Sequence, residues 1–250
     1  VFLRTWCSTR RRWTVAIAVG GLLAVPAVLH AVYYLHLFDG WIAFYRWRAI
    51  PGTELTGGGV GLPAGIVHAR LAASKPPLRH LLCAGVIAVT IALVAAPWTK
   101  QILLPLPDSQ LQDRWGGGVC LQSTPSTCGP CAAATVLRTF GVEISESELA
   151  RDSYSTATGT EVWYLARALR AHGVEAEFEQ FDPANDNYPI PSVAGVRVGG
   201  PSGFGHFVAL FGRTVEGVVV GDPLSGREVL SMAEFRERYT PTGFFLVIRR

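Results

Sequence analysis

The stretch QSTPSTCGPCAAATVLRTFG, residues 122–141, decides how the second half of the chain is interpreted. A polar segment ends at Thr127, and a run rich in apolar residues continues to Phe140 before Gly141. This pattern predicts a helix that begins near Cys128 and ends at the glycine. Cys128 then lies in the first helical turn, where unpaired backbone N–H groups and the positive end of the helix dipole favour a thiolate.

The same stretch contains CGPC, which matches the motif of thiol–disulfide oxidoreductases. Such a fold requires a buried strand that leads into the motif, but the preceding segment DRWGGGVCLQSTPST (113–127) predicts a loop. The later segment ALRAHG (168–173) also lacks the proline that such a fold places beside its disulfide. An oxidoreductase that uses Cys128 and Cys131 therefore remains only as an alternative.

A zinc centre is a second alternative for these thiols. Its ligands would be drawn from Cys120, Cys128, Cys131 and His206. Seven residues separate Cys120 from Cys128, which is outside the usual spacing of about two to four residues between zinc ligands. We therefore expect no metal and no cofactor.

Charge divides the chain into two parts. Residues 1–100 hold 10 Lys and Arg against 2 Asp and Glu, a net charge of +8. Residues 101–250 hold 12 Lys and Arg against 17 Asp and Glu, a net charge of −5. No basic cluster is interleaved with aromatic residues, so we expect no nucleic-acid partner.

Two uncharged runs, residues 13–38 and 81–98, lie in the basic part. About 20 apolar residues suffice for a helix to cross the hydrocarbon core. The segment HLFDGW (36–41) offers no signal-peptide cleavage site after the first run. The sequence thus predicts two transmembrane helices in a membrane region of residues 1–104, with the lipid bilayer as a partner.

The basic residues on the two sides of these spans favour opposite orientations in the membrane. The arginines before the first run favour a cytoplasmic N-terminus, whereas the connection carries Arg46, Arg48, Arg70, Lys75 and Arg79. With two spans the N-terminus and the C-terminal domain share a side, and the balance slightly favours the cytoplasm for both. The Gly- and Pro-rich segment 51–65 predicts a re-entrant or interfacial connection rather than a domain core.

Residues 105–250 have the pattern of an α+β domain, with helices first and an antiparallel sheet after them. Ser145 with Glu148, Thr160, and Ser231 with Glu234 mark the starts of further helices. The strands are predicted in VEAEFEQF (174–181), SVAGVRVG (192–199), HFVALFG (206–212), GVVVGDP (217–223) and GFFLVIRR (243–250).

A thiol nucleophile requires a base and a group that orients the base. This domain contains two histidines, and His172 lies at a helix end, where an imidazole has a structural role. His206 begins a strand that a short turn joins to the strand of Asp222; if the turn centres on Thr214, the two residues are directly opposite. The amide of Gln122 can donate to an oxyanion together with the Cys128 backbone N–H.

These motifs resemble those of the bacteriocin-processing cysteine peptidases, the papain-like leader-peptide peptidases that are fused to ABC exporters. QSTPSTCGPCAAATVLRTFG is similar to their Gln-to-Cys motif, and GHFVALFG with VVVGDP is similar to their His and Asp motifs. The resemblance covers residues 118–250 and implies a papain-like fold. It further implies that Cys128 is the nucleophile, His206 the base, Asp222 its orienting group and Gln122 part of the oxyanion hole.

The chain departs from the exporters in its order of domains. The peptidase region follows two apolar runs, and the 250 residues contain no GxxxxGK[ST] motif for ATP. We therefore expect a stand-alone, membrane-anchored cysteine peptidase that acts on peptides or proteins, with cleavage after Gly-Gly and a separate exporter as the finer expectations. A leader-binding domain without catalysis is the remaining alternative.

Overall fold

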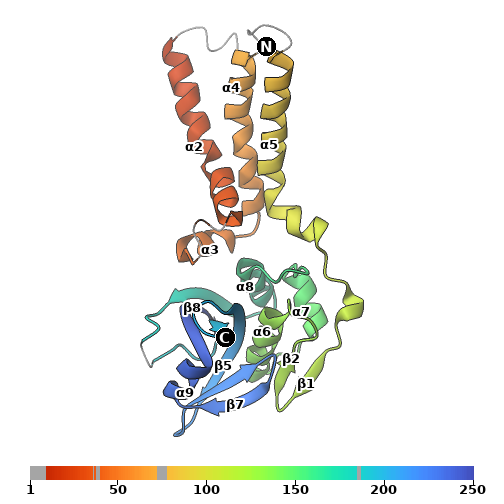
Figure 1. Ribbon diagram of the computed structural model, residues 1–250, viewed down its shortest axis with the longest axis vertical. Helices are drawn as coiled ribbons and strands as arrows, with labels where there is room; N and C mark the ends of the chain where they lie inside the picture. Colours follow the sequence, from red (N-terminus) through yellow and green to blue (C-terminus); the bar gives the residue numbers. More distant parts are fainter. Residues whose placement is uncertain (1–9, 36, 38–39, 72–77, 185–186) are drawn as a thin grey trace. The chain divides into compact units, whose positions relative to one another are not determined.

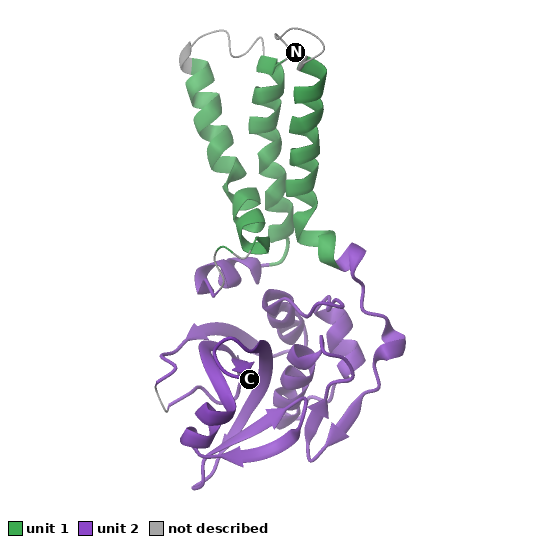
Figure 2. Ribbon diagram, in the orientation of Figure 1, with its two compact units in different colours: residues 1–39, 51–100 green, residues 40–50, 101–250 purple. Residues whose placement is uncertain are grey.

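The computed structural model describes residues 10–35, 37, 40–71, 78–184 and 187–250. The chain divides into two compact units, residues 1–39 with 51–100 and residues 40–50 with 101–250 (Figure 2). Residues 40–50, which belong to the membrane region in the sequence-based division at residue 104, thus cluster with the C-terminal domain.

The first unit contains helices α2 (Arg10–Tyr34), α4 (Gly61–Leu71) and α5 (Leu78–Leu103), with the 3-10 helix η1 (Thr53–Val60) before α4. Figure 1 shows α2, α4 and α5 side by side. In the described part of the chain, two stretches are long and apolar enough to cross a membrane, Arg12–Tyr34 of α2 and Arg79–Leu103 of α5.

These helices differ from the predicted runs at their ends and between them. The α2 helix ends at Tyr34, whereas the predicted run continues to Phe38, which lies outside the described residues. The predicted connection is helical over Thr53–Leu71, because η1 and α4 occupy it. Glycine disfavours helix in isolation, so the pattern alone suggested irregular structure; packing against neighbouring helices decides the conformation.

The second unit is built on a six-stranded antiparallel sheet with the strand order β3-β8-β4-β5-β6-β7. Its strands are β3 (Glu175–Gln180), β4 (Ser192–Val198), β5 (Phe204–Arg213), β6 (Val218–Asp222), β7 (Gly226–Leu230) and β8 (Tyr239–Arg249). A separate hairpin of β1 (Arg114–Gly116) and β2 (Val119–Leu121) precedes the helices. The five strands predicted from residue 174 onward are confirmed, and β7 is additional. The prediction of a loop without a strand over residues 113–127 is wrong, because β1 and β2 form there.

The helices of this unit are α3 (Ile42–Arg48), α6 (Cys128–Thr139), α7 (Glu146–Asp152), α8 (Val162–Ala171) and α9 (Met232–Arg238), with a 3-10 turn, η2 (Asp108–Gln110), before β1. The α6 helix packs on β5 and its neighbours, as Figure 1 shows. The packing is tight at Gly221 of β6, where an added Cβ would lie 3.0 Å from the Thr135 methyl carbon. The opposite face holds an apolar cluster around Phe235 of α9 and Phe245 of β8. The α+β prediction is confirmed.

Two of the three predicted helix caps form. The Ser145 hydroxyl accepts a hydrogen bond from the Glu148 backbone N–H (3.0 Å), and Ser231 with Glu234 forms a complete capping box. The prediction for Thr160 is wrong: Glu161 occupies the N-cap position, and its side chain makes no capping hydrogen bond. The Thr160 hydroxyl instead pairs with the hydroxyl of Ser155 at 2.6 Å.

The short helix α3 packs within the second unit although the sequence placed it in the membrane region. Phe44 and Tyr45 are buried against the rings of Trp163 and Phe178. The guanidinium of Arg48, 1% exposed, lies 4.9 Å from the centre of the Trp163 ring. These contacts make α3 part of the C-terminal domain.

Removal of a buried ring from α3 therefore destabilises that domain. Phe44 is 4% exposed and meets Trp163 edge to face, so Phe44→Ala is expected to lower the free energy of unfolding by about 3 kcal/mol. Urea unfolding of the detergent-solubilised chain, followed by tryptophan fluorescence, measures the change. Ile50→Ala is the matched control, because Ile50 is 57% exposed. Equal midpoints for both variants would contradict this role of α3.

Candidate active site

Cys128 is the first residue of α6 and is partly exposed. The chain turns into the helix through Thr124 and Thr127: the backbone N–H and the hydroxyl of Thr127 both donate to the Thr124 carbonyl, at 3.3 and 3.2 Å. Thr127 is fully buried, which fixes the turn. The thiol therefore lies at the helix start, in the positive potential of the first turn, and remains accessible.

His206 of β5 lies between Cys128 and Asp222. Its Nε2 is 2.8 Å from Oδ1 of Asp222, so Nδ1 is the ring nitrogen left for its hydrogen bond with Cys128. Burial lowers the pKa of His206, but the hydrogen bonds with Asp222 and Cys128 outweigh it and raise the pKa to about 9. The arrangement favours an imidazolium beside the thiol at neutral pH.

The His206–Asp222 contact forms in a different strand register from the predicted one. The pairs Ala209–Gly221 and Leu210–Val220 shift the hairpin by two positions, so the two residues are diagonal neighbours rather than directly opposite. A shift of two keeps both side chains on one face of the sheet, whereas a shift of one would separate them. The predicted contact is therefore present although the predicted register is wrong.

Asp222 has two further partners. Its Oδ2 accepts a hydrogen bond from the Tyr239 hydroxyl at 2.7 Å, and its Oδ1 accepts one from the Leu224 backbone N–H at 2.8 Å. Burial raises the pKa of Asp222, but the bonds from His206, Tyr239 and Leu224 outweigh this effect and lower the pKa to about 2. Sequence reasoning missed Tyr239, because no local motif links a tyrosine at the start of β8 to the end of β6.

Gln122 is held in the loop before α6 at both backbone and side chain. Its backbone N–H donates to the Pro223 carbonyl at 3.0 Å, which joins this loop to the residue after Asp222. Its Nε2 donates to the Thr124 carbonyl at 2.7 Å. An amide nitrogen carries two hydrogens, so Nε2 retains a second donor. The side chain is 9% exposed, and its Oε1 has no hydrogen-bond partner.

A buried carboxylate supports the same loop. Glu146 is fully buried, and its two oxygens accept hydrogen bonds from the backbone N–H (2.7 Å) and the hydroxyl (2.5 Å) of Ser123. Gln122 and Thr124 flank this anchored serine. Glu146 was not recognised in the sequence, where it is one of several acidic residues near a helix start.

The second cysteine of CGPC has different surroundings from the first. Cys131 is fully buried; burial and a hydrogen bond with Cys120 both raise the pKa of its thiol. All described cysteines are free thiols. Because Cys131 faces Cys120 and Cys128 faces His206, the arrangement does not favour the redox pair or the zinc centre considered for the sequence.

The other histidine of this domain follows the last turn of α8. The Nε2 of His172 is 2.8 Å from Oδ2 of Asp152 at the end of α7. This contact joins two helices and lies apart from the contacts of Cys128.

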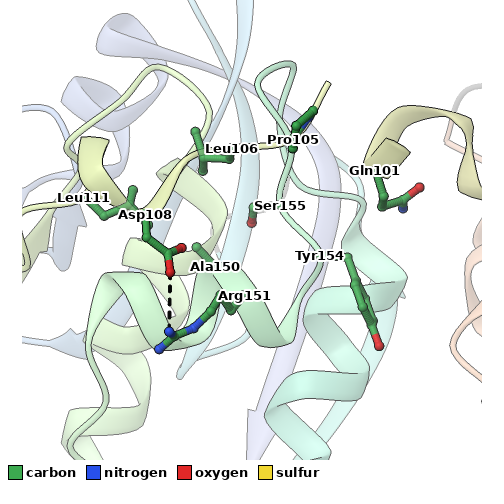
Figure 3. A pocket seen from close by; sticks show the side chains of 9 residues that line it. All are labelled: Gln101, Pro105, Leu106, Asp108, Leu111, Ala150, Arg151, Tyr154 and Ser155. Atoms are coloured by element: carbon green, nitrogen blue, oxygen red, sulfur yellow. Dashed lines mark hydrogen bonds and ion pairs between the residues drawn. The ribbon is translucent and has the colours of Figure 1, made fainter. Parts of the chain in front are cut away.

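A pocket of about 200 Å³ opens elsewhere in the second unit, between the segment that follows α5 and the end of α7 (Figure 3). Leu106 and Ala150 lie on its walls, and Asp108 pairs with Arg151 at 3.5 Å. Cys128, His206 and Asp222 are absent from its lining. The pocket is therefore distinct from the candidate active site.

Comparison with known proteins identifies relatives of this unit. A model of the Peptidase C39 family matches residues 118–250. An uncharacterized protein of Methanothermobacter thermautotrophicus is 30% identical over 137 residues, which are 53% of the present chain and 88% of the relative.

Solved structures show the same resemblance at lower identity. A double glycine motif protease from an AMS/PCAT transporter, solved with the leader peptide, is 22% identical with a TM-score of 0.45, over 56% of this chain and 95% of that one. The peptidase domain of Streptococcus ComA, a bi-functional ABC transporter of a quorum-sensing pathway, is 20% identical with a TM-score of 0.44, over 52% and 96%.

The geometry predicts that Asp222 sustains the charge on His206. Asp222→Asn removes the negative acceptor, so the pKa of His206 is expected to fall from about 9. Because this pKa is raised on folding, the stability that His206 contributes is complete below the ordinary value of 6.5 and is lost as pH rises through about 9. The free energy of unfolding of Asp222→Asn is therefore expected to fall much less than that of the unmodified protein as pH rises from 6.5 to about 9.

Titration of the histidine Cε1–H signals by NMR measures the pKa of His206 directly. Asp152→Asn is the matched control, because it removes the partner of His172 and leaves His206 untouched. An unchanged His206 midpoint in Asp222→Asn would show that the carboxylate does not hold the imidazolium.

Proposed function

The chain belongs to the peptidase C39 family and is a cysteine peptidase, and from this premise we propose that it is a membrane-anchored enzyme that cleaves leader-type peptides after a Gly-Gly pair. The observation that carries the proposal is the chain of contacts from Cys128 through His206 to Asp222. The apolar stretches of α2 and α5 support the membrane anchor.

In the proposed mechanism Cys128 is the nucleophile and His206 the general base. The Cys128 thiolate attacks the carbonyl carbon of the scissile bond, and negative charge develops on the carbonyl oxygen. This oxygen accepts hydrogen bonds from the Cys128 backbone N–H and Gln122 Nε2. His206 transfers its proton to the leaving amine as the C–N bond breaks. A thioester remains on Cys128.

The second half of the reaction regenerates the enzyme. His206, now neutral, takes a proton from water, whose oxygen attacks the thioester carbon. The tetrahedral intermediate collapses, and the Cys128 thiolate leaves beside the imidazolium. Asp222 holds Nε2 throughout, which keeps Nδ1 directed at the reacting atoms. Tyr239 positions Asp222 through its hydroxyl.

The finer specificity rests on the three ordered motifs that the chain shares with double-glycine peptidases. We extend to this chain the substrate named for the AMS/PCAT protease, a leader peptide with a double-glycine motif. The proposed partner is a peptide exporter, because the AMS/PCAT protease belongs to a transporter.

The two cysteines of CGPC are expected to behave oppositely in a cleavage assay. With a quenched fluorescent peptide that contains a Gly-Gly leader site, Cys128→Ala abolishes turnover because the nucleophile is gone. Cys131→Ala, the matched control, retains turnover because this buried thiol faces Cys120. Cleavage by Cys128→Ala together with its loss in Cys131→Ala would overturn the assignment.

Gln122 is expected to act in the transition state. Removal of one oxyanion donor by Gln122→Ala should lower kcat about 10²- to 10³-fold and leave KM nearly unchanged. Gln112→Ala is the control, because Gln112 is exposed and contributes only its backbone N–H to Ser123. A higher KM with an unchanged kcat would instead assign Gln122 to substrate binding.

A further inference from the structure

Residues 40–50, which contain α3, belong to the same compact unit as the candidate active site. The Arg46 guanidinium donates to the Phe178 carbonyl of β3 at 2.8 Å, and the Arg170 guanidinium of α8 donates to the Ala49 carbonyl at 3.1 Å. Together with the buried rings of Phe44 and Tyr45, these bonds make α3 part of the folded peptidase unit. The chain therefore enters this unit twice, once after α2 and once after α5.

Contacts within the first unit agree with this connectivity. The ammonium of Lys100, near the end of α5, lies 5.5 Å from the centre of the Tyr34 ring, at the end of α2. The two helices therefore run in the same direction, with their C-terminal ends together. Two parallel spans require the chain to cross the membrane once more between them.

The segment η1–α4 makes that return. The guanidinium of Arg70, at the end of α4, lies 4.4 Å from the centre of the Trp13 ring, at the start of α2. Ile66 of α4 packs on Ala16 of α2 in a small buried cluster. This segment thus runs antiparallel to α2 and ends where α2 begins.

The length of the segment η1–α4 is close to the thickness of the hydrocarbon core of a membrane. Eight residues of η1 rise about 2.0 Å each, and eleven residues of α4 rise about 1.5 Å each. The total of about 32 Å equals the hydrocarbon thickness of about 30 Å within the precision of these values. Residues 55–67 contain no charged side chain, and the charged residues Glu54 and Arg70 lie near opposite ends.

Glycines allow this irregular segment to pack closely between the long helices. A Cβ on Gly59 would clash with the Leu23 carbonyl of α2, and one on Gly57 would lie 3.7 Å from the Leu93 carbonyl of α5. Small residues at helix contacts are typical of membrane bundles. Backbone that departs from the α-helix is tolerated at membrane depth where protein covers it, as it covers Gly57 of the 3-10 helix here.

We infer that η1–α4 is a third, returning membrane pass, that the N-terminus and the active site lie on opposite sides of the membrane, and that the substrates are extracytoplasmic peptides. The inference rests on the membrane anchor of the proposed function. It replaces the two-pass topology, with a shared side for both ends, that the sequence alone favoured.

The basic residues assign the two sides. Three passes bring Arg10–Arg12 at the start of α2 to the same end as Arg70 and Arg79, which flank the connection from α4 to α5. Arg46 and Arg48, which opposed this orientation in the sequence, are bound within the peptidase unit. Short basic loops remain in the cytoplasm, so the active site faces away from it. Its substrates are then peptides that have already crossed the membrane.

Labelling of single cysteines in spheroplasts of a bacterial host tests the topology. The full chain carries Ser in place of Cys7, Cys83 and Cys128, and keeps the buried Cys120 and Cys131. Val215→Cys reports the peptidase side from a fully exposed turn, and Ala73→Cys reports the α4–α5 connection. A membrane-impermeant maleimide is expected to label Val215→Cys in intact spheroplasts and Ala73→Cys only after permeabilisation.

Two results would overturn the inference. Labelling of both positions under the same condition would leave two passes, and the reverse pattern would place the active site in the cytoplasm. The labelled protein lacks Cys128, so the outcome is independent of catalysis. Cleavage of the Gly-Gly peptide in detergent tests the proposed function separately, and cleavage of the same impermeant peptide by intact spheroplasts is expected only if both proposals hold.

Discussion

The hydrogen bond between His206 and Asp222 is the interaction on which the rest of the site depends. It is carried by the β5–β6 hairpin, and Asp222 is held in turn by the Tyr239 hydroxyl and the Leu224 backbone. The next residue, Pro223, accepts a hydrogen bond from the backbone of Gln122. One end of one strand therefore orients the proposed base and anchors the loop of the proposed oxyanion donor. The position of β6 in the sheet therefore determines where His206 and Gln122 lie in the site.

This arrangement explains why the four residues of CGPC do not act as one motif. Cys128 lies at the helix start and pairs with His206, whereas Cys131, one turn later, is buried with Cys120. A helix has 3.6 residues per turn, so residues three apart point to similar sides, but Cys128 is partly exposed whereas Cys131 is fully buried. Burial, rather than residue type, distinguishes Cys128, the proposed nucleophile, from Cys131, which packs in the interior.

The sequence was informative where a local pattern fixes the outcome. Five strands, the α6 helix and the contact between His206 and Asp222 could be predicted, because alternation and turn residues act over a few positions. The exact hairpin register could not, since the bulge near Leu210 depends on packing between strands. Tyr239 and Glu146 were missed because their partners are distant in sequence. The α3 and α4 helices were missed because tertiary packing overrides their weak propensity.

Alkylation of Cys128 tests the central claim most directly, since an imidazolium at His206 should stabilise the reactive thiolate. The rate of modification by iodoacetamide at pH 6.5, resolved by residue with mass spectrometry, is compared between the unmodified sequence and His206→Gln. We predict that Cys128 reacts while buried Cys131 does not, and that His206→Gln slows the reaction roughly tenfold or more. Equal rates in the two proteins would contradict the account.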